Sequence, residues 1–157
     1  MSKKILLLLF LSACGFSPMF NGNNTSIYVA PISGINGIEL RNALNARFGV
    51  ANEATAKYRL SITLDNPLTK YKALETTGVA TWQEIAISAS YNLSENEKII
   101  ASGKESASES YTFVRYLVAS NASYNNAVSN TINELAEKIG TRTIAEIQKL
   151  EIKSTEK

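Results

Sequence analysis

The chain has 157 residues, of which 45% are apolar and 19% charged, a composition that suits one packed domain. It contains no histidine and a single cysteine. Catalysis by a histidine base, Cys/His zinc sites, CxxC redox pairs and intrachain disulfides are therefore excluded. Carboxylates, lysines and tyrosines remain, so an enzyme is disfavoured but not forbidden.

The first fourteen residues have the order of a signal peptide. Lys3 and Lys4 precede an apolar run, Ile5–Leu11, that is shorter than the about twenty residues needed to cross a bilayer. Small residues and then Cys14 follow. The ending Leu-Ser-Ala-Cys resembles the bacterial lipobox, in which the cysteine is acylated and becomes the N-terminus. We predict a lipoprotein signal at 1–13 and a covalent lipid anchor on Cys14, with no other cofactor and no metal.

Loss of this signal changes the charge balance. The chain has 16 Lys and Arg against 14 Asp and Glu, and Lys3 and Lys4 leave with the signal, so 14 cations face 14 anions. No nucleic-acid partner is expected, because such a protein needs a clustered cationic face. Gly15, where Asp would favour retention at the inner membrane, resembles the sorting signal for the outer membrane. The competing interpretation makes Cys14 a buried thiol of a cytosolic domain.

Residues 14–25 are expected to form a lipidated tether, because Asn and Gly dominate their second half. A single domain is expected over residues 26–150. Its first strand is predicted within Ser26–Ile32, a run rich in β-forming residues that contains Pro31.

The first helix is predicted over residues 38–48. Asn36 and Glu39 match a capping box at its start, and Gly49 is expected to end it. Apolar residues follow at spacings of three and four, as an amphipathic helix requires.

Three strands are predicted next. Tyr58–Leu64 alternates apolar and polar residues and stops before Pro67. Residues 85–93 alternate in the same way, in a strand that could begin as early as Val79. The partner strand, from Lys98 to about Tyr111, is rich in Ser and Ala, so we expect it at an edge or against another molecule.

Residues 119–150 change period, with apolar positions advancing by three and four, which predicts one long amphipathic helix. Residues 151–157 are expected to be a disordered tail. The sheet and the two helices are each apolar on one face and must bury those faces against one another. The order β-α-β-β-β-α therefore predicts an α+β two-layer sandwich. Its two helices pack on one face of a four-stranded sheet. The other face, rich in Ser, Thr, Asn and Glu, must meet water or a polar surface.

Three stretches carry a family resemblance. Cys14–Phe20, Gly37–Leu44 and the C-terminal helix from Ala122 through Ala127 to Leu135–Arg142 resemble segments of the lipopolysaccharide-assembly lipoprotein family (LptE) in its alphaproteobacterial form. Met19 and Phe20 depart mildly from the family's Leu-Tyr. Asn and Ser also occupy much of Asn121–Asn133 in the last helix, where the family has more Arg and Asp.

The resemblance implies a role that is not enzymatic. Such proteins are lipid-anchored at the periplasmic face of the outer membrane, plug the β-barrel LptD, help it assemble and contact lipopolysaccharide. The alternatives are another outer-membrane lipoprotein, such as a pilotin or the auxiliary lipoprotein of a lipid-trafficking ABC system, or an enzyme. The enzyme would use Asp65, Glu84 or Glu105 with Tyr91.

Lys70 and Lys72 form the densest cationic spot after the signal, in the connection that follows Pro67. They are candidates for contact with lipopolysaccharide phosphates, since lysine is a flexible point charge. A solvated loop explains them as well. Trp82 is expected to serve packing, although a tryptophan at the start of a strand could instead anchor at an interface.

Four further cations have plain structural explanations. Arg59 and Lys104 are expected to be exposed charges on strands. Arg41 and Arg142 match positions of the family, and ion pairs on a helix surface explain them equally well.

Overall fold

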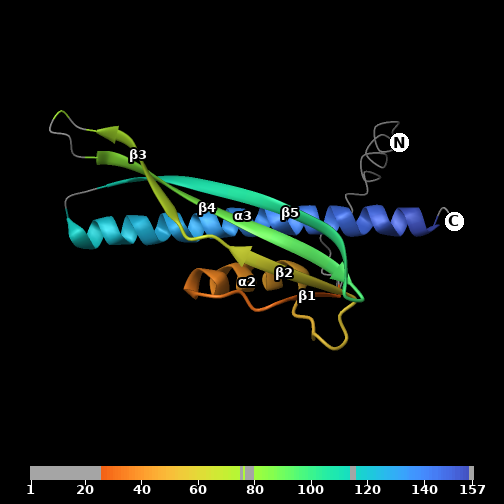
Figure 1. Ribbon diagram of the computed structural model, residues 1–157. Coiled ribbons are helices and arrows are strands. Elements are labelled where there is room, and N and C mark those ends of the chain that lie inside the picture. Colours follow the sequence, from red (N-terminus) through yellow and green to blue (C-terminus); the bar gives the residue numbers. More distant parts are fainter. Residues whose placement is uncertain (1–25, 75, 77–79, 114–115, 156–157) are drawn as a thin grey trace, which may run out of the picture.

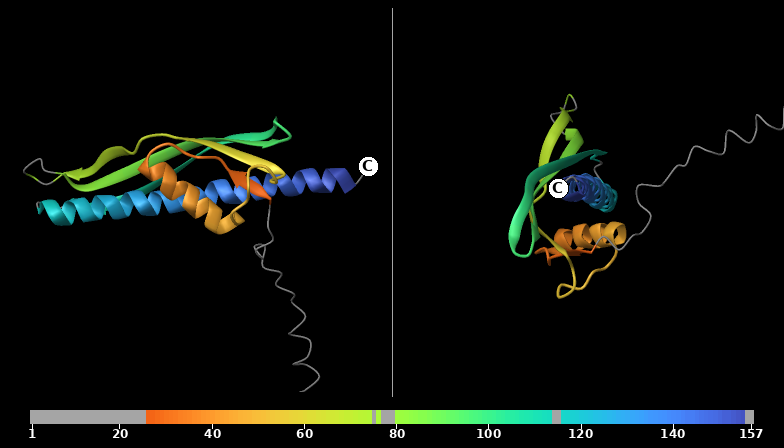
Figure 2. Two further views of the ribbon diagram at one scale, coloured as in Figure 1. Left: turned by 90° about the horizontal axis from the view of Figure 1, so that it is seen from below. Right: turned by 90° about the vertical axis from the view of Figure 1, so that its right-hand side faces the viewer.

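The structure is a computed structural model that describes residues 26–74, 76, 80–113 and 116–155. It has two layers, a five-stranded mixed sheet and two helices that cover one face of it (Figures 1 and 2). The predicted α+β class, with two helices on one side of a sheet, is confirmed. Cys14 and its tether lie outside the described residues.

The first strand, β1 (Ile27–Val29), pairs in parallel with β2 (Tyr58–Leu64). Both strands start near the expected residues, and β2 has the bounds that the alternation predicted. Packing of the inward-facing side chains stabilises this strand pair. The buried residues are Ile27, Val29, Tyr58 and Leu60.

The helix α2 (Ile35–Phe48) begins earlier than expected, at Ile35 rather than Ile38. Gly34, with a φ of 83°, turns the chain, and its carbonyl accepts the Ile38 amide at 3.1 Å. The capping-box prediction is therefore wrong, because Asn36 and Glu39 lie within the helix. Gly49 ends it as predicted, its amide donating to the Asn45 carbonyl at 2.9 Å.

The centre of the sheet is β4 (Ala80–Glu95). Along one edge it pairs with β5 (Lys98–Thr112) over nearly the whole length of both strands. Along the other edge it pairs first with β3 (Leu68–Leu74) and then with β2. All these pairs are antiparallel, and β5 lies at an edge of the sheet, as predicted.

The strand β3 corrects the prediction of a loop after Pro67 and makes the sheet five-stranded. All of its side chains are exposed. Because neither face of β3 is buried, its sequence need not alternate apolar and polar residues as a half-buried strand does. The free backbone groups of β4 supply the hydrogen bonds that make it a strand. The register shifts on both sides of Ala73, which marks a β-bulge or irregularity in the pairing at this end.

The helix α3 (Leu117–Thr155) runs the length of the sheet beneath β4 and β5 (Figures 1 and 2). Its 39 residues correspond to about 58 Å. Residues 151–155, expected to be disordered, are helical. Of the described helices, none is both long and apolar enough to cross a membrane.

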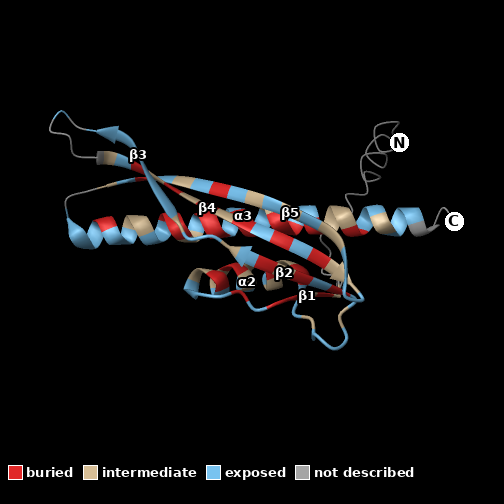
Figure 3. Cartoon of the chain, viewed as in Figure 1, coloured by how far each residue is buried: buried red, intermediate tan, exposed pale blue. Residues whose placement is uncertain are grey.

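The core lies between the inner face of the sheet and the two helices (Figure 3). Along β4, every second residue faces the helices and is buried. The largest fully buried side chains include Ile27, Leu40, Leu44, Leu60, Ile85, Ile87, Leu93, Ile132, Leu135 and Ile139.

Candidate functional site

The face of the sheet that the helices leave open carries short polar side chains. Along β5 every second residue is exposed there: Ser102, Lys104, Ser106, Ser108, Ser110 and Thr112. They lie in register with Asn92, Ser90, Ser88, Ala86, Glu84 and Trp82 of β4. Hydroxyls donate and accept hydrogen bonds without the desolvation cost of a charge. This polar face suits an aqueous or hydrogen-bonding partner.

Lys70 and Lys72 lie on β3 rather than in a loop. Lys72 Nζ is 2.9 Å from Glu84 Oε2 on the outer face, and only 17% of the Glu84 side chain is exposed. Lys70 is opposite Glu84 in register. Within the described residues Lys70 makes no ion pair, so it is the better placed of the two for an external anion.

Arg59 and Lys104 have the surface pairings of ordinary strand charges. Arg59 pairs with Glu53 and holds the pKa of that carboxyl below its usual value. Lys104 Nζ lies 3.3 Å from Asp65 Oδ2. Neither pair is buried, so each contributes little to stability.

Arg41 and Arg142 fasten parts of the fold together. Arg41 Nε donates to the Val29 carbonyl at 3.0 Å, which joins α2 to β1. Arg142 Nε lies 3.2 Å from Glu105 Oε1, which joins α3 to β5. Arg142 does form an ion pair, but with a strand rather than along its own helix, whereas Arg41 donates to a backbone carbonyl.

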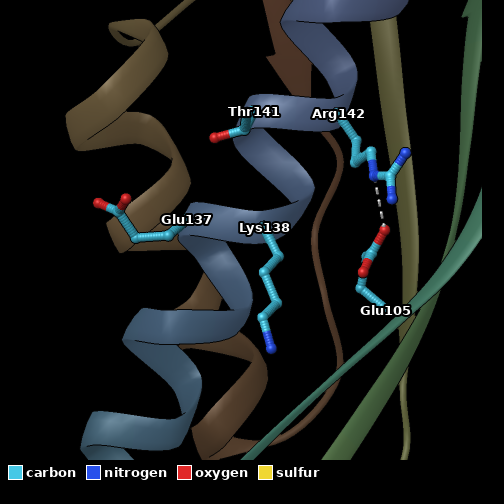
Figure 4. Close-up of a pocket in the computed structure, with 5 residues that line it drawn as sticks. All are labelled: Glu105, Glu137, Lys138, Thr141 and Arg142. Carbon is cyan, nitrogen blue, oxygen red and sulfur yellow. Dashed lines mark ion pairs between the residues drawn. The ribbon is translucent and has the colours of Figure 1, made fainter.

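The Arg142 pair lies in a hollow of about 370 Å³ between α3 and β5 (Figure 4). Its lining residues are Glu105, Glu137, Lys138, Thr141 and Arg142. Lys138 Nζ donates to the Ser106 carbonyl at 2.8 Å, and Arg47 pairs with Glu137 at 3.1 Å. These charged groups are already paired with one another or with a backbone carbonyl. The pairs hold α3 against the edge of β5, so the hollow is not a charged binding site.

The residues of the enzyme alternative are divided between separate places. Asp65 and Glu84 each pair with a lysine of the sheet, whereas Glu105 lies near Tyr91. Burial raises the pKa of the Tyr91 hydroxyl, and the charge of Glu105 raises it further. Within the described residues, no group of three or more acidic, Cys or His side chains is placed to hold a metal.

One end of the molecule exposes large apolar side chains from the β3–β4 strand pair and from the start of α3. They are Tyr71, Leu74 and Trp82 of the β3–β4 pair and Tyr116, Leu117 and Val118 at the start of α3. Exposure ranges from 50% for Trp82 to 83% for Val118, so Trp82 lies half exposed at the surface and not in the core. Figures 1 and 2 place both parts at the same end, which we call the apolar end.

The sequence does carry a signal for this surface. Tyr116–Asn133 contains no charged residue, although much of its helical surface is exposed. Interface cores are depleted of charge. This uncharged half of α3 is therefore a second candidate contact surface, beside the polar face.

The sequence matches no family model and no curated protein. Solved structures do match: rare lipoprotein B from Shewanella oneidensis superposes with a TM-score of 0.62 at 15% identity, over 80% of this chain and 98% of that chain. The chain therefore shares its fold with this bacterial lipoprotein. A Caulobacter crescentus CB15 chain assigned as a lipoprotein also gives a TM-score of 0.62, at 19% identity, covering 76% and 88% of the two chains. Lipoprotein B from Nitrosomonas europaea gives 0.56 at 14%, covering 78% and 86%.

Proposed function

We propose that this chain is an outer-membrane lipoprotein of the LptE type, anchored through acylated Cys14 at the periplasmic face. It acts without catalysis, plugs and helps assemble an LptD-type β-barrel, and contacts the lipopolysaccharide that the barrel exports. The fold shared with rare lipoprotein B over 98% of that chain carries the proposal. The resemblance of the first fourteen residues to a lipoprotein signal supports it independently.

The polar face supplies the surface for the barrel. The lumen of a large outer-membrane barrel is polar, and its apolar band is about 25 Å tall. The 16 residues of β4 extend over about 50 Å. The β4–β5 pair is therefore long enough to run through such a barrel with its hydroxyl-rich face against the wall.

Lysine 70 is the proposed contact for lipopolysaccharide phosphates. Its ammonium group is exposed and has no carboxylate partner among the described residues, whereas Lys72 is engaged by Glu84. Lys72 contributes by neutralising the carboxylate that Lys70 faces in register, which would otherwise repel phosphate.

Affinity purification from detergent-solubilised membranes tests the barrel contact. Ser106→Arg with Ser108→Arg places two long cations on the polar face, and we expect the barrel to be lost from the purified complex. Ala46→Arg, on the exposed side of α2, is the matched control and should retain it. Both variants must first show the parental circular dichroism spectrum.

The same purification separates the competing roles. Recovery of one very large barrel supports the proposal. Recovery of an ABC transporter or a secretion channel instead would assign the chain to another class of envelope lipoprotein. Undiminished barrel recovery with the polar-face variant would mean that another surface makes the contact.

A further inference from the structure

The apolar end has no partner among the described residues that covers it. Tyr71, Leu74 and Trp82 belong to a strand pair that stands out from the rest of the sheet (Figure 2). The exposed start of α3 lies at the same end. Such a set of large apolar side chains on a monomer marks a binding surface.

We propose that the apolar end docks into the headgroup region of a lipid leaflet. Tryptophan and tyrosine favour the membrane–water interface, because their rings are apolar and their N–H or O–H groups remain in contact with water. Leu74, Leu117 and Val118 provide aliphatic groups that can enter the acyl region. Lys70, beside them on β3, can reach lipid phosphates.

The uncharged start of α3 favours lipid over a charged protein surface at this part of the apolar end. The uncharged stretch Tyr116–Asn133 brings no ion toward the hydrocarbon, where each charge costs several kcal/mol. The apolar groups also project from the strand pair and from α3 rather than line a groove. A fluid leaflet accepts such projections, whereas a protein partner would need matching pockets.

The position of the preceding chain restricts the geometry of docking, and here the inference rests on the proposed lipid anchor. Ser26 lies beside Tyr58, which pairs with Glu95 at the far end of β4 from the apolar end. The twelve tether residues 14–25 span at most about 43 Å, and β4 about 50 Å. Anchor and apolar end can reach one leaflet together only when the long axis of the domain lies near the membrane plane. The docked state therefore belongs to the chain before it enters the barrel.

The single tryptophan of the chain is the reporter for this docking. The acylated chain is reconstituted into phosphatidylcholine vesicles, with and without phosphatidylglycerol. We expect the Trp82 emission to shift to shorter wavelength, acrylamide quenching to fall and brominated acyl chains to quench. Leu117→Ser with Val118→Ser, both at exposed positions, should reverse all three effects while the chain stays on the vesicles.

A relocated reporter is the matched control. Trp82→Phe with Ala46→Trp moves the indole to the exposed side of α2, where acrylamide should quench equally with and without lipid. Lys70→Ala should weaken only the added preference for phosphatidylglycerol, by about fivefold.

The outcomes separate this inference from the proposed function. If the chain floats with the vesicles but acrylamide still quenches Trp82 fully, the docking proposal is overturned and the anchor is not. Shielding of Trp82 only after a purified barrel is added would assign the apolar end to a protein partner and also overturn it. A chain that does not float at all would instead contradict the anchor.

Discussion

Close packing at Gly37 shows how a single residue sets the position of α2. A Cβ atom at Gly37 would lie 2.8 Å from both the Cγ2 and the carbonyl oxygen of Ile32. At Gly140 of α3 the first obstacle is the side chain of Arg47, with Cδ 2.6 Å from the added atom. Backbone cannot yield as a long side chain can, so the two glycines differ in what they tolerate.

Gly37→Ala should lower the free energy of unfolding. Overpacking costs about 1–3 kcal/mol, and the helix propensity of alanine returns about 1 kcal/mol. Gly140→Ala is the matched comparison and should cost less, because Arg47 can move. Urea denaturation measures both, and a Gly37→Ala protein as stable as the parent would show that Ile32 can shift.

Two buried tyrosines should make stability depend on pH in the alkaline range. Burial raises the pKa of the Tyr91 and Tyr111 hydroxyls from the ordinary value of 10.0, because the phenolate is disfavoured inside the protein. The unfolded chain therefore loses these protons at lower pH than the folded chain. Their contribution is complete below about pH 10 and is lost as pH rises through the raised values.

Thermal melts from neutral pH to pH 11 check this expectation, with phenolate absorbance followed in parallel. Tyr91→Phe should flatten part of the alkaline decline. Near neutral pH the melting temperature should vary little, because the chain has no histidine. An alkaline decline that is unchanged in both Tyr91→Phe and Tyr111→Phe would contradict the assignment.

Among the elements, β5 shows how an edge strand is protected. The Ser88 carbonyl of β4 accepts the Asp65 amide at 2.9 Å and so points away from β5. Ser106 lies opposite Ser88, so the Ser106 carbonyl points away from β4, to the free edge of the sheet. Lys138 of α3 donates to that oxygen at 2.8 Å. A charged side chain at an edge discourages pairing with other chains. The long helix thus supports the sheet and also covers its edge.

The seam between α3 and the sheet should be intolerant of charge. Leu135 is fully buried there, and Leu135→Asp should cost several kcal/mol against a total stability of about 5–15 kcal/mol. Asn133→Asp, exposed on the same helix, is the control and should melt like the parent. Circular dichroism and melting measure both, and a normal melt for Leu135→Asp would mean that the helix face has been misassigned.

The whole molecule is polarised along its length. Ion pairs gather around Arg47, Lys138 and Arg142, whereas the first half of α3, up to Asn133, carries no charge. The predicted net charge of the processed chain is zero, which argues against long-range steering to an anionic partner. Short-range hydrogen bonds and apolar contact are the forces that remain for binding.

Cys14→Ala should separate anchoring from folding. The described core lies wholly within residues 27–147, so the variant should fold yet lose metabolic labelling by fatty acid and remain unprocessed. The parent chain is the control for labelling. A labelled Cys14→Ala protein would show that the lipid is attached elsewhere.

The double change Lys70→Glu with Lys72→Glu should distinguish lipid from barrel contact. Lipopolysaccharide binding should fall, because Lys70 is reversed and Glu84 loses its partner. Barrel recovery should persist at low and high salt, since the polar face relies on uncharged groups. Lys104→Glu is a control for general charge on the same face. Loss of the barrel with lipopolysaccharide binding intact would reverse the assignment.

Elements with their own periodicity could be predicted from the sequence. Alternation in Tyr58–Leu64 and the three-and-four spacing of the long helix follow directly from which side chains must be buried. The polar outer face could be predicted for the same reason, since the residues between buried ones must point away from the core. The side chains of the polar face thus follow largely from the alternation of residues along its strands.

Only the tertiary structure decided what depends on neighbours distant in sequence. The strand β3 exists because the edge of β4 offers backbone partners, and its wholly exposed side chains leave no pattern to read. The same pairing brings Lys72 to Glu84 and leaves Lys70 open. Trp82, Leu117 and Val118 form one apolar end because the chain returns from β5 into α3 at the place where β4 began. Periodicity records whether a side chain is buried, but which exposed side chains meet is settled by the path of the chain.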